Sequence, residues 1–263
     1  MRTTVRWLWT ATIAAAGALA AGGRSHAAAP TPVLVELFTS EGCSDCPPAD
    51  AVLGRLIASQ PIAGVEIVGL GQHVDYWDQL GWKDRFSSAA LTNRQHVYGA
   101  RFNLDSVYTP QMIVDGRAQL VGSDDGAARK AIERAADSPH GVVRIAIEPT
   151  VARAIPVVVT VENLPPLGRG DHADVIVAIT EDRLRTEVKR GENHGRTLTH
   201  AAVVRSMTTI GRAALDGPTS AHAELALGDD WQRDQLKIVA FVQEQRGRTI
   251  LASAAAPLQN ARR

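Results

Sequence analysis

Hydrophobic positions divide the chain into two parts with different periods. Up to about residue 140, short apolar runs alternate with stretches whose apolar residues recur every three or four positions. The runs predict buried strands and the stretches predict amphipathic helices. Strands are predicted at 33–38, 65–70, 111–115 and 118–121, and helices between Cys46 and Pro61, over 87–98 and after Ser123. Residues 28–140 therefore predict a βαβαββα domain, with Asp115-Gly116 as the turn of a hairpin.

From residue 141 onward the apolar positions alternate, as in Val143, Ile145 and Ile147, and no long helical pattern remains. Further strand-like stretches lie at 198–204, 236–243 and 249–254. Such alternation is typical of strands with one buried face. Residues 141–263 therefore predict a separate, all-β sandwich-like domain of roughly seven or eight antiparallel strands.

The N-terminal segment has the pattern of an export signal. Arg2 and Arg6 precede an alanine-rich apolar run over 7–21, and small residues follow at 25–27. The run is shorter than the roughly 20 apolar residues that a transmembrane anchor requires. We expect residues 1–27 to be a cleaved signal peptide, and the mature protein to be secreted, without a stable membrane anchor. In a diderm bacterium its compartment would be the periplasm.

Composition excludes one class of partner. The 28 Lys and Arg residues balance the 28 Asp and Glu residues, and 45% of the chain is apolar. Nucleic-acid binding that relies on bulk positive charge needs an excess of cations. We therefore expect a packed protein that binds no nucleic acid.

The two cysteines of the chain, Cys43 and Cys46, lie between the first predicted strand and the first predicted helix. Two intervening residues allow a reversible disulfide, and the start of a helix favours a thiolate. We assign Cys43 as the accessible nucleophile and Cys46 as the resolving thiol. A static disulfide is one alternative. A zinc site, which needs about four ligands, is another, and we expect neither a metal nor an organic cofactor.

This arrangement resembles the thioredoxin superfamily, in which a strand leads to C-x-x-C at the start of a helix and an X-Pro later leads into a hairpin. Thr109-Pro110 occupies that place. The resemblance implies that Pro110 is cis and packs against the cysteines, and that Thr109 lines the substrate groove. It also places Glu36 near the buried acid that helps to move the proton of the resolving thiol. Glu36 as a cap for a neighbouring loop is the alternative.

A narrower resemblance covers nearly the whole mature chain. Four motifs, at 37–50, 73–82, 109–116 and 191–200, look like an uncharacterised family of secreted bacterial thioredoxin-like proteins, catalogued as domain of unknown function 1223. The aromatic-rich segment 73–82 is expected either to form a lip beside the cysteines or to pack as a loop. Segment 191–200 is either a ligand-binding loop or a set of turns.

These observations favour an exported thiol-disulfide oxidoreductase whose partner is a protein or small-molecule thiol or disulfide. Glu41 and Asp45 place negative charge near Cys43, so we expect a reducing or isomerising pair rather than a strong oxidant. One alternative is a non-catalytic thioredoxin-like scaffold or binding protein with a structural disulfide. A copper-handling thiol protein is a further alternative, and the presence of only three methionines counts against it.

Overall fold

A computed structural model of the chain describes residues 1, 29–149, 153–214 and 216–258. The predicted signal peptide lies outside these residues except for Met1. The elements of the first half are β1 (Thr31–Thr39), α1 (Cys46–Ser59), β2 (Val65–His73), the 3-10 helix η1 (Asp78–Leu80), α2 (Ala89–Arg101), β3 (Gln111–Val114), β4 (Ala118–Val121) and α3 (Asp125–Ala136). The predicted βαβαββα order of the long elements is confirmed.

The second half is built from strands, as predicted. They are β5 (Val142–Ile147), β6 (Ala154–Glu162), β7 (Ala173–Glu181), β8 (Leu184–Glu187), β9 (Thr197–His200), β10 (Val203–Arg212), β11 (Thr219–Ala226), β12 (Leu236–Glu244) and β13 (Ile250–Pro257), with the 3-10 helix η2 (Arg233–Gln235) before β12. The stretch predicted as one strand at 198–204 is instead two strands, because the chain turns at Ala202, whose φ is 49°.

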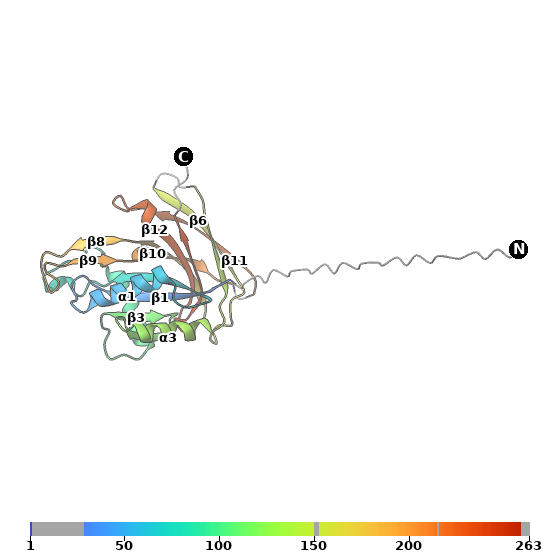
Figure 1. Cartoon of the computed structure of the whole chain (residues 1–263), viewed down its shortest axis with the longest axis horizontal. Helices are drawn as coiled ribbons and strands as arrows, with labels where there is room; N and C mark the ends of the chain where they lie inside the picture. Colours follow the sequence, from blue (N-terminus) through green and yellow to red (C-terminus); the bar gives the residue numbers. More distant parts are fainter. Residues whose placement is uncertain (2–28, 150–152, 215, 259–263) are drawn as a thin grey trace.

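One large sheet runs through both halves, in the strand order β13-β12-β7-β10-β2-β1-β3-β4 (Figure 1). The halves meet where Val203 of β10 pairs with Gly71 of β2. A Cβ on residue 71 would lie 2.9 Å from the carbonyl oxygen of Ala201, so the close approach requires glycine.

The chain is therefore a mixed α/β structure on a large multi-strand sheet. The second half was expected to be a separate all-β sandwich. This expectation is corrected, because four strands of the second half extend the sheet of the first half. The division at residue 140 into two domains remains a prediction.

Helices cover both faces of the first-half strands. Val33, Val35 and Leu37 of β1 pack with buried residues of α1 and α3 on one face. On the other face, Leu34 and Phe38 pack in clusters that include residues of α2. Because strand side chains alternate between faces, β1 contributes to two cores at once. None of the helices in the described ranges is long and apolar enough to cross a bilayer.

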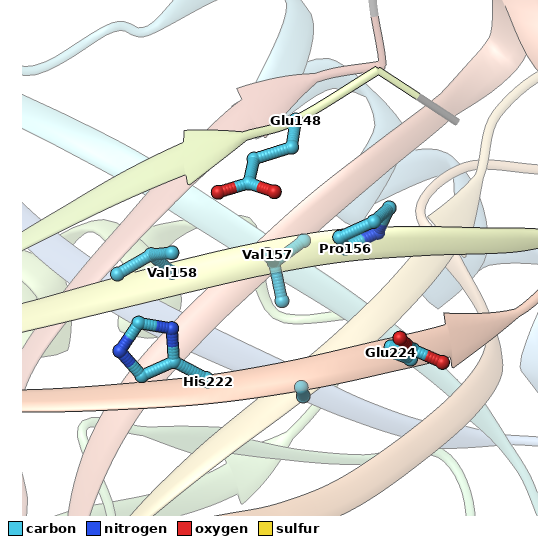
Figure 2. Close-up of a pocket in the computed structure, with 7 residues that line it drawn as sticks. Glu148, Pro156, Val157, Val158, His222 and Glu224 are labelled. Atoms are coloured by element: carbon cyan, nitrogen blue, oxygen red, sulfur yellow. The ribbon is translucent and has the colours of Figure 1, made fainter. Parts of the chain in front are cut away.

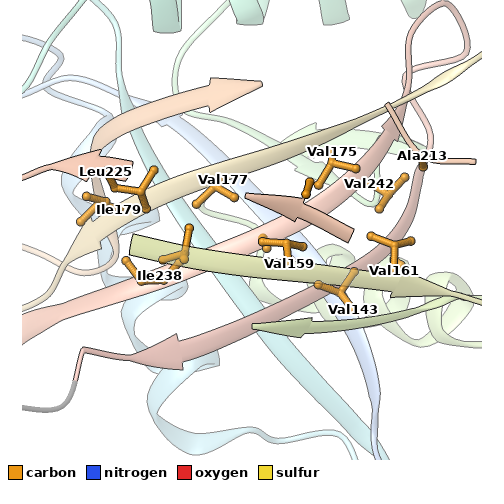
Figure 3. Packing of buried hydrophobic residues seen from close by; sticks show 14 of the residues in the cluster. Val143, Val159, Val161, Val175, Val177, Ile179, Ala213, Leu225, Ile238 and Val242 are labelled. Atoms are coloured by element: carbon orange, nitrogen blue, oxygen red, sulfur yellow. The ribbon is translucent and has the colours of Figure 1, made fainter. Parts of the chain in front are cut away.

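A second, three-stranded sheet of order β11-β6-β5 packs on the second-half strands of the large sheet. Figure 3 shows the valines and isoleucines between these layers. Val157, Val159 and Val161 of β6 are each at most 1% exposed, whereas their neighbours in the strand are partly exposed. The alternating pattern thus produces a two-layer sandwich, one layer of which belongs to the large sheet.

The two halves also share a hydrophobic core. Val68 and Leu70 of β2 are in one buried cluster with Val204, Val239 and Phe241 from the second half. Each fully buried side chain of this size contributes about 1.5–3 kcal/mol relative to an exposed one. The contact between the halves is therefore part of the core.

The predicted hairpin turn is confirmed and lies against the second half. Asp115 and Gly116 both have positive φ, 47° and 62°. A Cβ on residue 116 would lie 1.9 Å from the carbonyl oxygen of Arg248. Position 116 therefore requires glycine for two reasons, its positive φ and the close approach of Arg248. The helix after the hairpin is capped by Asp124 rather than Ser123, because the Asp124 carboxylate accepts a hydrogen bond from the backbone N–H of Ala127 at 2.8 Å.

Candidate redox site

Cys43 and Cys46 form a disulfide in the turn between β1 and α1, with their Cα atoms 5.4 Å apart. Cys46 is the first residue of α1, and proline follows it in the first helical turn, where the missing N–H has no intrahelical acceptor. Cys43 is 1% exposed and Cys46 is 0% exposed. The expected accessibility of Cys43 is therefore corrected, because both cysteines are buried in the disulfide form.

Thr109 lies beside the disulfide, and Pro110 follows it directly before β3. The peptide bond between them is cis, and the carbonyl oxygen of Thr109 is 4.0 Å from the Sγ of Cys43. The Thr109 hydroxyl accepts a hydrogen bond from the indole N–H of Trp77 at 2.8 Å. The hairpin and segment 73–82 thus meet at the cysteines.

Glu36 lies on the opposite side of the sheet. Its neighbours in β1, Val35 and Leu37, face α1, so the Glu36 side chain faces α2. There its carboxylate accepts hydrogen bonds from Arg94, at 2.6 and 2.9 Å, and from the Tyr98 hydroxyl. Burial alone would raise the pKa of Glu36, but Arg94 holds it below the ordinary value. The expected role in proton transfer to the resolving thiol is corrected, and so is the loop-capping alternative: Glu36 forms a buried ion pair.

Segment 73–82 forms a wall beside the cysteine turn. A Cβ on Gly42 would lie 3.0 Å from the Cβ of Trp77, so this aromatic residue occupies the space next to Cys43. Trp82 donates its indole N–H to the Glu41 carboxylate at 2.8 Å. Both expectations for the segment hold in part, because it packs tightly and it borders the cysteines.

A loop of the second half, which sequence reasoning left unassigned, reaches the same turn. The side-chain amide of Asn193 donates to the carbonyl oxygens of Glu41 and Cys43, both at 2.9 Å. The Glu192 carboxylate accepts a hydrogen bond from the backbone N–H of Ser44 at 3.0 Å. We call residues 191–200 the strap, because they join the cysteine turn to the second half. The strap was visible in the sequence only as a motif of glycines and polar residues.

His200, at the end of the strap, is buried between two carboxylates. Its Nε2 is 3.2 Å from Oε1 of Glu41, and its Nδ1 is 3.7 Å from Oδ2 of Asp50. Burial alone would lower the pKa of His200, but Asp50 and Glu41 together raise it to about 9. The imidazole is therefore charged near neutral pH. Asp50 lies one helical turn after Cys46, so this cluster packs along the helix that carries the disulfide.

The charges near Cys43 thus differ from the expected ones. Glu41 is 0% exposed and is paired with Trp82 and His200, so its charge is compensated. Asp45 is exposed, and its side chain makes no capping hydrogen bond to α1. Ser44 lowers the pKa of Glu192 by hydrogen bonding to its carboxylate. The solvent-facing negative charges at the turn are therefore Asp45 and Glu192.

A separate hollow of about 310 Å³ lies on the three-stranded sheet (Figure 2). Its lining includes His222, Glu224 and Glu148, which come from β11 and the end of β5. Within the described ranges, no group of three or more His, Cys, Asp or Glu side chains is placed to hold a metal ion.

Comparison with known proteins identifies a family and a shared architecture. The sequence model of a family described as "Protein of unknown function (DUF1223)" matches residues 34–243. A search of curated proteins found no match. Among solved structures, a structural genomics protein from Agrobacterium tumefaciens is 26% identical, with a TM-score of 0.67 over 90% of this chain and 98% of that one. HBP35 of Porphyromonas gingivalis is 13% identical, with a TM-score of 0.62 over 88% of this chain and 76% of that one, and this likeness shows the fold alone.

Proposed function

The chain belongs to the DUF1223 family, and from the geometry of its cysteine site we propose that it is an exported thiol-disulfide oxidoreductase. The observation that carries the proposal is the Cys43–Cys46 disulfide at the start of α1, with the carbonyl oxygen of Thr109 4.0 Å from the Cys43 sulfur. The βαβαββα order of the long elements supports a thioredoxin-like first half. The partner is a protein or a small molecule that carries a thiol or disulfide.

The proposed thiol-disulfide exchange proceeds in two steps. A partner thiolate attacks the sulfur of Cys43, the Cys43–Cys46 bond breaks, and Cys46 leaves as a thiolate. A second partner thiolate then attacks the partner's sulfur in the mixed disulfide, which releases the partner as a disulfide and Cys43 as a thiolate. The reverse sequence reduces a partner disulfide. No bound cofactor takes part.

We propose a reducing or isomerising pair rather than a strong oxidant. Strong oxidants of this chemistry have an unusually stabilised thiolate. The exposed acidic residues at the turn, Asp45 and Glu192, oppose that stabilisation. The potential should therefore lie at roughly −180 to −270 mV, in the range of isomerases and thioredoxins. A value above roughly −150 mV in a glutathione titration would refute this.

A second candidate function is supported by burial. Because Cys43 and Cys46 are 1% and 0% exposed, the disulfide also suits a non-catalytic scaffold whose second half binds a partner. Exchange requires the sulfur of Cys43 to become accessible, whereas a scaffold requires it to stay covered. The two functions therefore differ in the rate of reduction in the folded state.

Native reduction separates the two candidates. The oxidised protein is incubated with a dithiol, with and without denaturant, and free thiols are counted over time. An oxidoreductase is reduced while folded, whereas a scaffold is reduced only when it unfolds. In the reduced protein, alkylation should label Cys43 faster than Cys46, and Cys46→Ser should trap mixed disulfides through Cys43. Equal labelling of the two would contradict the assigned roles.

We also propose export. Arg2, Arg6 and the apolar run that follows suit a cleaved signal, and disulfides persist mainly in oxidising compartments. Mass spectrometry of the protein from its native host should find a mature N-terminus near residue 28. An intact Met1 in the mature protein would contradict this.

A further inference from the structure

We propose that Glu192, supplied by the second half of the chain, lowers the redox potential of the Cys43–Cys46 pair by occupying the backbone amide next to Cys43. This rests on the proposed function, because a redox potential matters only if the disulfide exchanges. Glu192 is thus a positioning and charge-setting residue, and it never touches the partner's reacting atoms.

The first support is the hydrogen bond itself. Ser44 directly follows Cys43, in the turn that opens α1, and its N–H donates to the Glu192 carboxylate at 3.0 Å. Free N–H groups at a helix start normally stabilise a cysteine thiolate. At this turn the N–H of Ser44, two residues before the first residue of α1, is taken by an anion. Glu192 therefore occupies the backbone donor that follows Cys43 and adds a negative charge to the cysteine turn.

The second support is that the strap holds Glu192 in place. The next residue, Asn193, is fully buried, and it donates to the carbonyl oxygens of Glu41 and Cys43. Arg196 in turn donates to the Asn193 side-chain oxygen at 2.9 Å. Glu192 is exposed, but the adjacent residue Asn193 fixes its backbone by bonding the carbonyl oxygens of Glu41 and Cys43. Its carboxylate is therefore presented to Ser44 by a fixed segment.

The direction of the effect follows from which state carries the charge. Reduction of the pair produces a thiolate at Cys43, whereas the disulfide is neutral. A negative charge at Glu192 raises the free energy of the reduced state and leaves the oxidised state nearly unchanged. The disulfide is then favoured, and the pair becomes more reducing. Removal of the charge should make the pair more oxidising.

The test compares variants of the full mature chain equilibrated in glutathione buffers. Glu192→Gln keeps an acceptor for Ser44 and removes the charge, and Glu192→Ala removes both. Glu187→Gln, on an exposed residue of β8 that pairs with Lys189, is the control for loss of one negative charge from the same half. We expect Glu192→Gln to shift the equilibrium constant toward the reduced form by about three- to tenfold. Glu192→Ala should shift it at least as far, and Glu187→Gln should leave it unchanged.

Two further readouts follow from the same cause. The shift produced by Glu192→Gln should shrink at high salt, because exposed charges are screened. The alkylation rate of Cys43 at neutral pH should rise in this variant. Equal constants for Glu192→Gln and Glu187→Gln, with a wild-type disulfide that reduces in the folded state, overturn this inference alone. A wild-type disulfide that reduces only on unfolding overturns the proposed function together with it.

Discussion

The side-chain amide of Asn193 donates a hydrogen bond to the carbonyl oxygen of Cys43 at 2.9 Å, from 150 residues further along the chain. The same amide reaches the carbonyl oxygen of Glu41 at 2.9 Å. Asn193 is 0% exposed, so these carbonyl groups have no water to replace it. The conformation of the cysteine turn therefore depends on both halves of the chain.

Asn193→Ala should loosen this turn. Two buried carbonyl groups lose their donor, and an unsatisfied buried acceptor costs about 1–3 kcal/mol. We expect the free energy of unfolding in urea to fall by about that amount, and a dithiol to reduce the folded protein faster. Asn93→Ala, at an exposed position of α2, is the control. If both variants match the wild type in stability and reduction rate, the strap does not hold the turn.

His200 should make stability depend on pH. Asp50 and Glu41 outweigh the effect of burial and raise the pKa of His200 to about 9, whereas its ordinary value is about 6.5. The folded state thus binds the proton more tightly than the unfolded state. The resulting stabilisation, about 3 kcal/mol at most, is complete below pH 6.5 and is lost as pH rises through 9.

The measurement is the free energy of unfolding between pH 6 and pH 10 for the wild type and for His200→Gln. The difference between the two should narrow as pH rises. A difference that stays constant across this range would show that His200 is neutral in the folded protein.

Glu36→Gln should reduce stability and leave disulfide chemistry unchanged. The substitution leaves the guanidinium of Arg94, which is largely buried, without its carboxylate, and breaking such a pair typically costs about 3–5 kcal/mol. Because Glu36 faces α2, the relative alkylation rates of Cys43 and Cys46 should match those of the wild type. A selective change in the reactivity of Cys46 would instead restore the proton-transfer role.

The first half should be unstable alone. A chain of residues 28–140 exposes Val68 and Leu70, which are 2% and 0% exposed in the whole protein, and it lacks β10, one of the two strands that pair with β2. We expect it to show little or no cooperative unfolding transition in urea, followed by tryptophan fluorescence. A transition with a free energy close to that of the full chain would show that the halves are independent domains.

Local pattern predicted the local elements well. Apolar runs and helical periods located the strands and helices of the first half, because each element buries its own face. The union of the two sheets was not predictable in this way. The strands of the two halves pair at Gly71 and Val203, and this pairing leaves no period in the sequence. A glycine inside a buried strand was the available sign of a close approach.

The site was predictable only in part. The structure brings Cys43, Cys46 and Thr109 together, and their redox roles stay predictions. Glu36 was misplaced, although alternation along β1 sets it on the face opposite Leu37. Residues of the strap were missed as site residues because their contacts span about 150 positions.

The binding of the strap to the cysteine turn has a consequence for how the protein matures. Synthesis proceeds from the N-terminus, so Cys43 and Cys46 emerge long before Asn193 and His200. Until the later residues arrive, the two thiols are open to any oxidising catalyst. Once the strap binds, Asn193 takes the carbonyl groups of Glu41 and Cys43, and in the complete fold both cysteines are buried. We therefore expect the thiols to be oxidised faster before the C-terminal half has folded than after it.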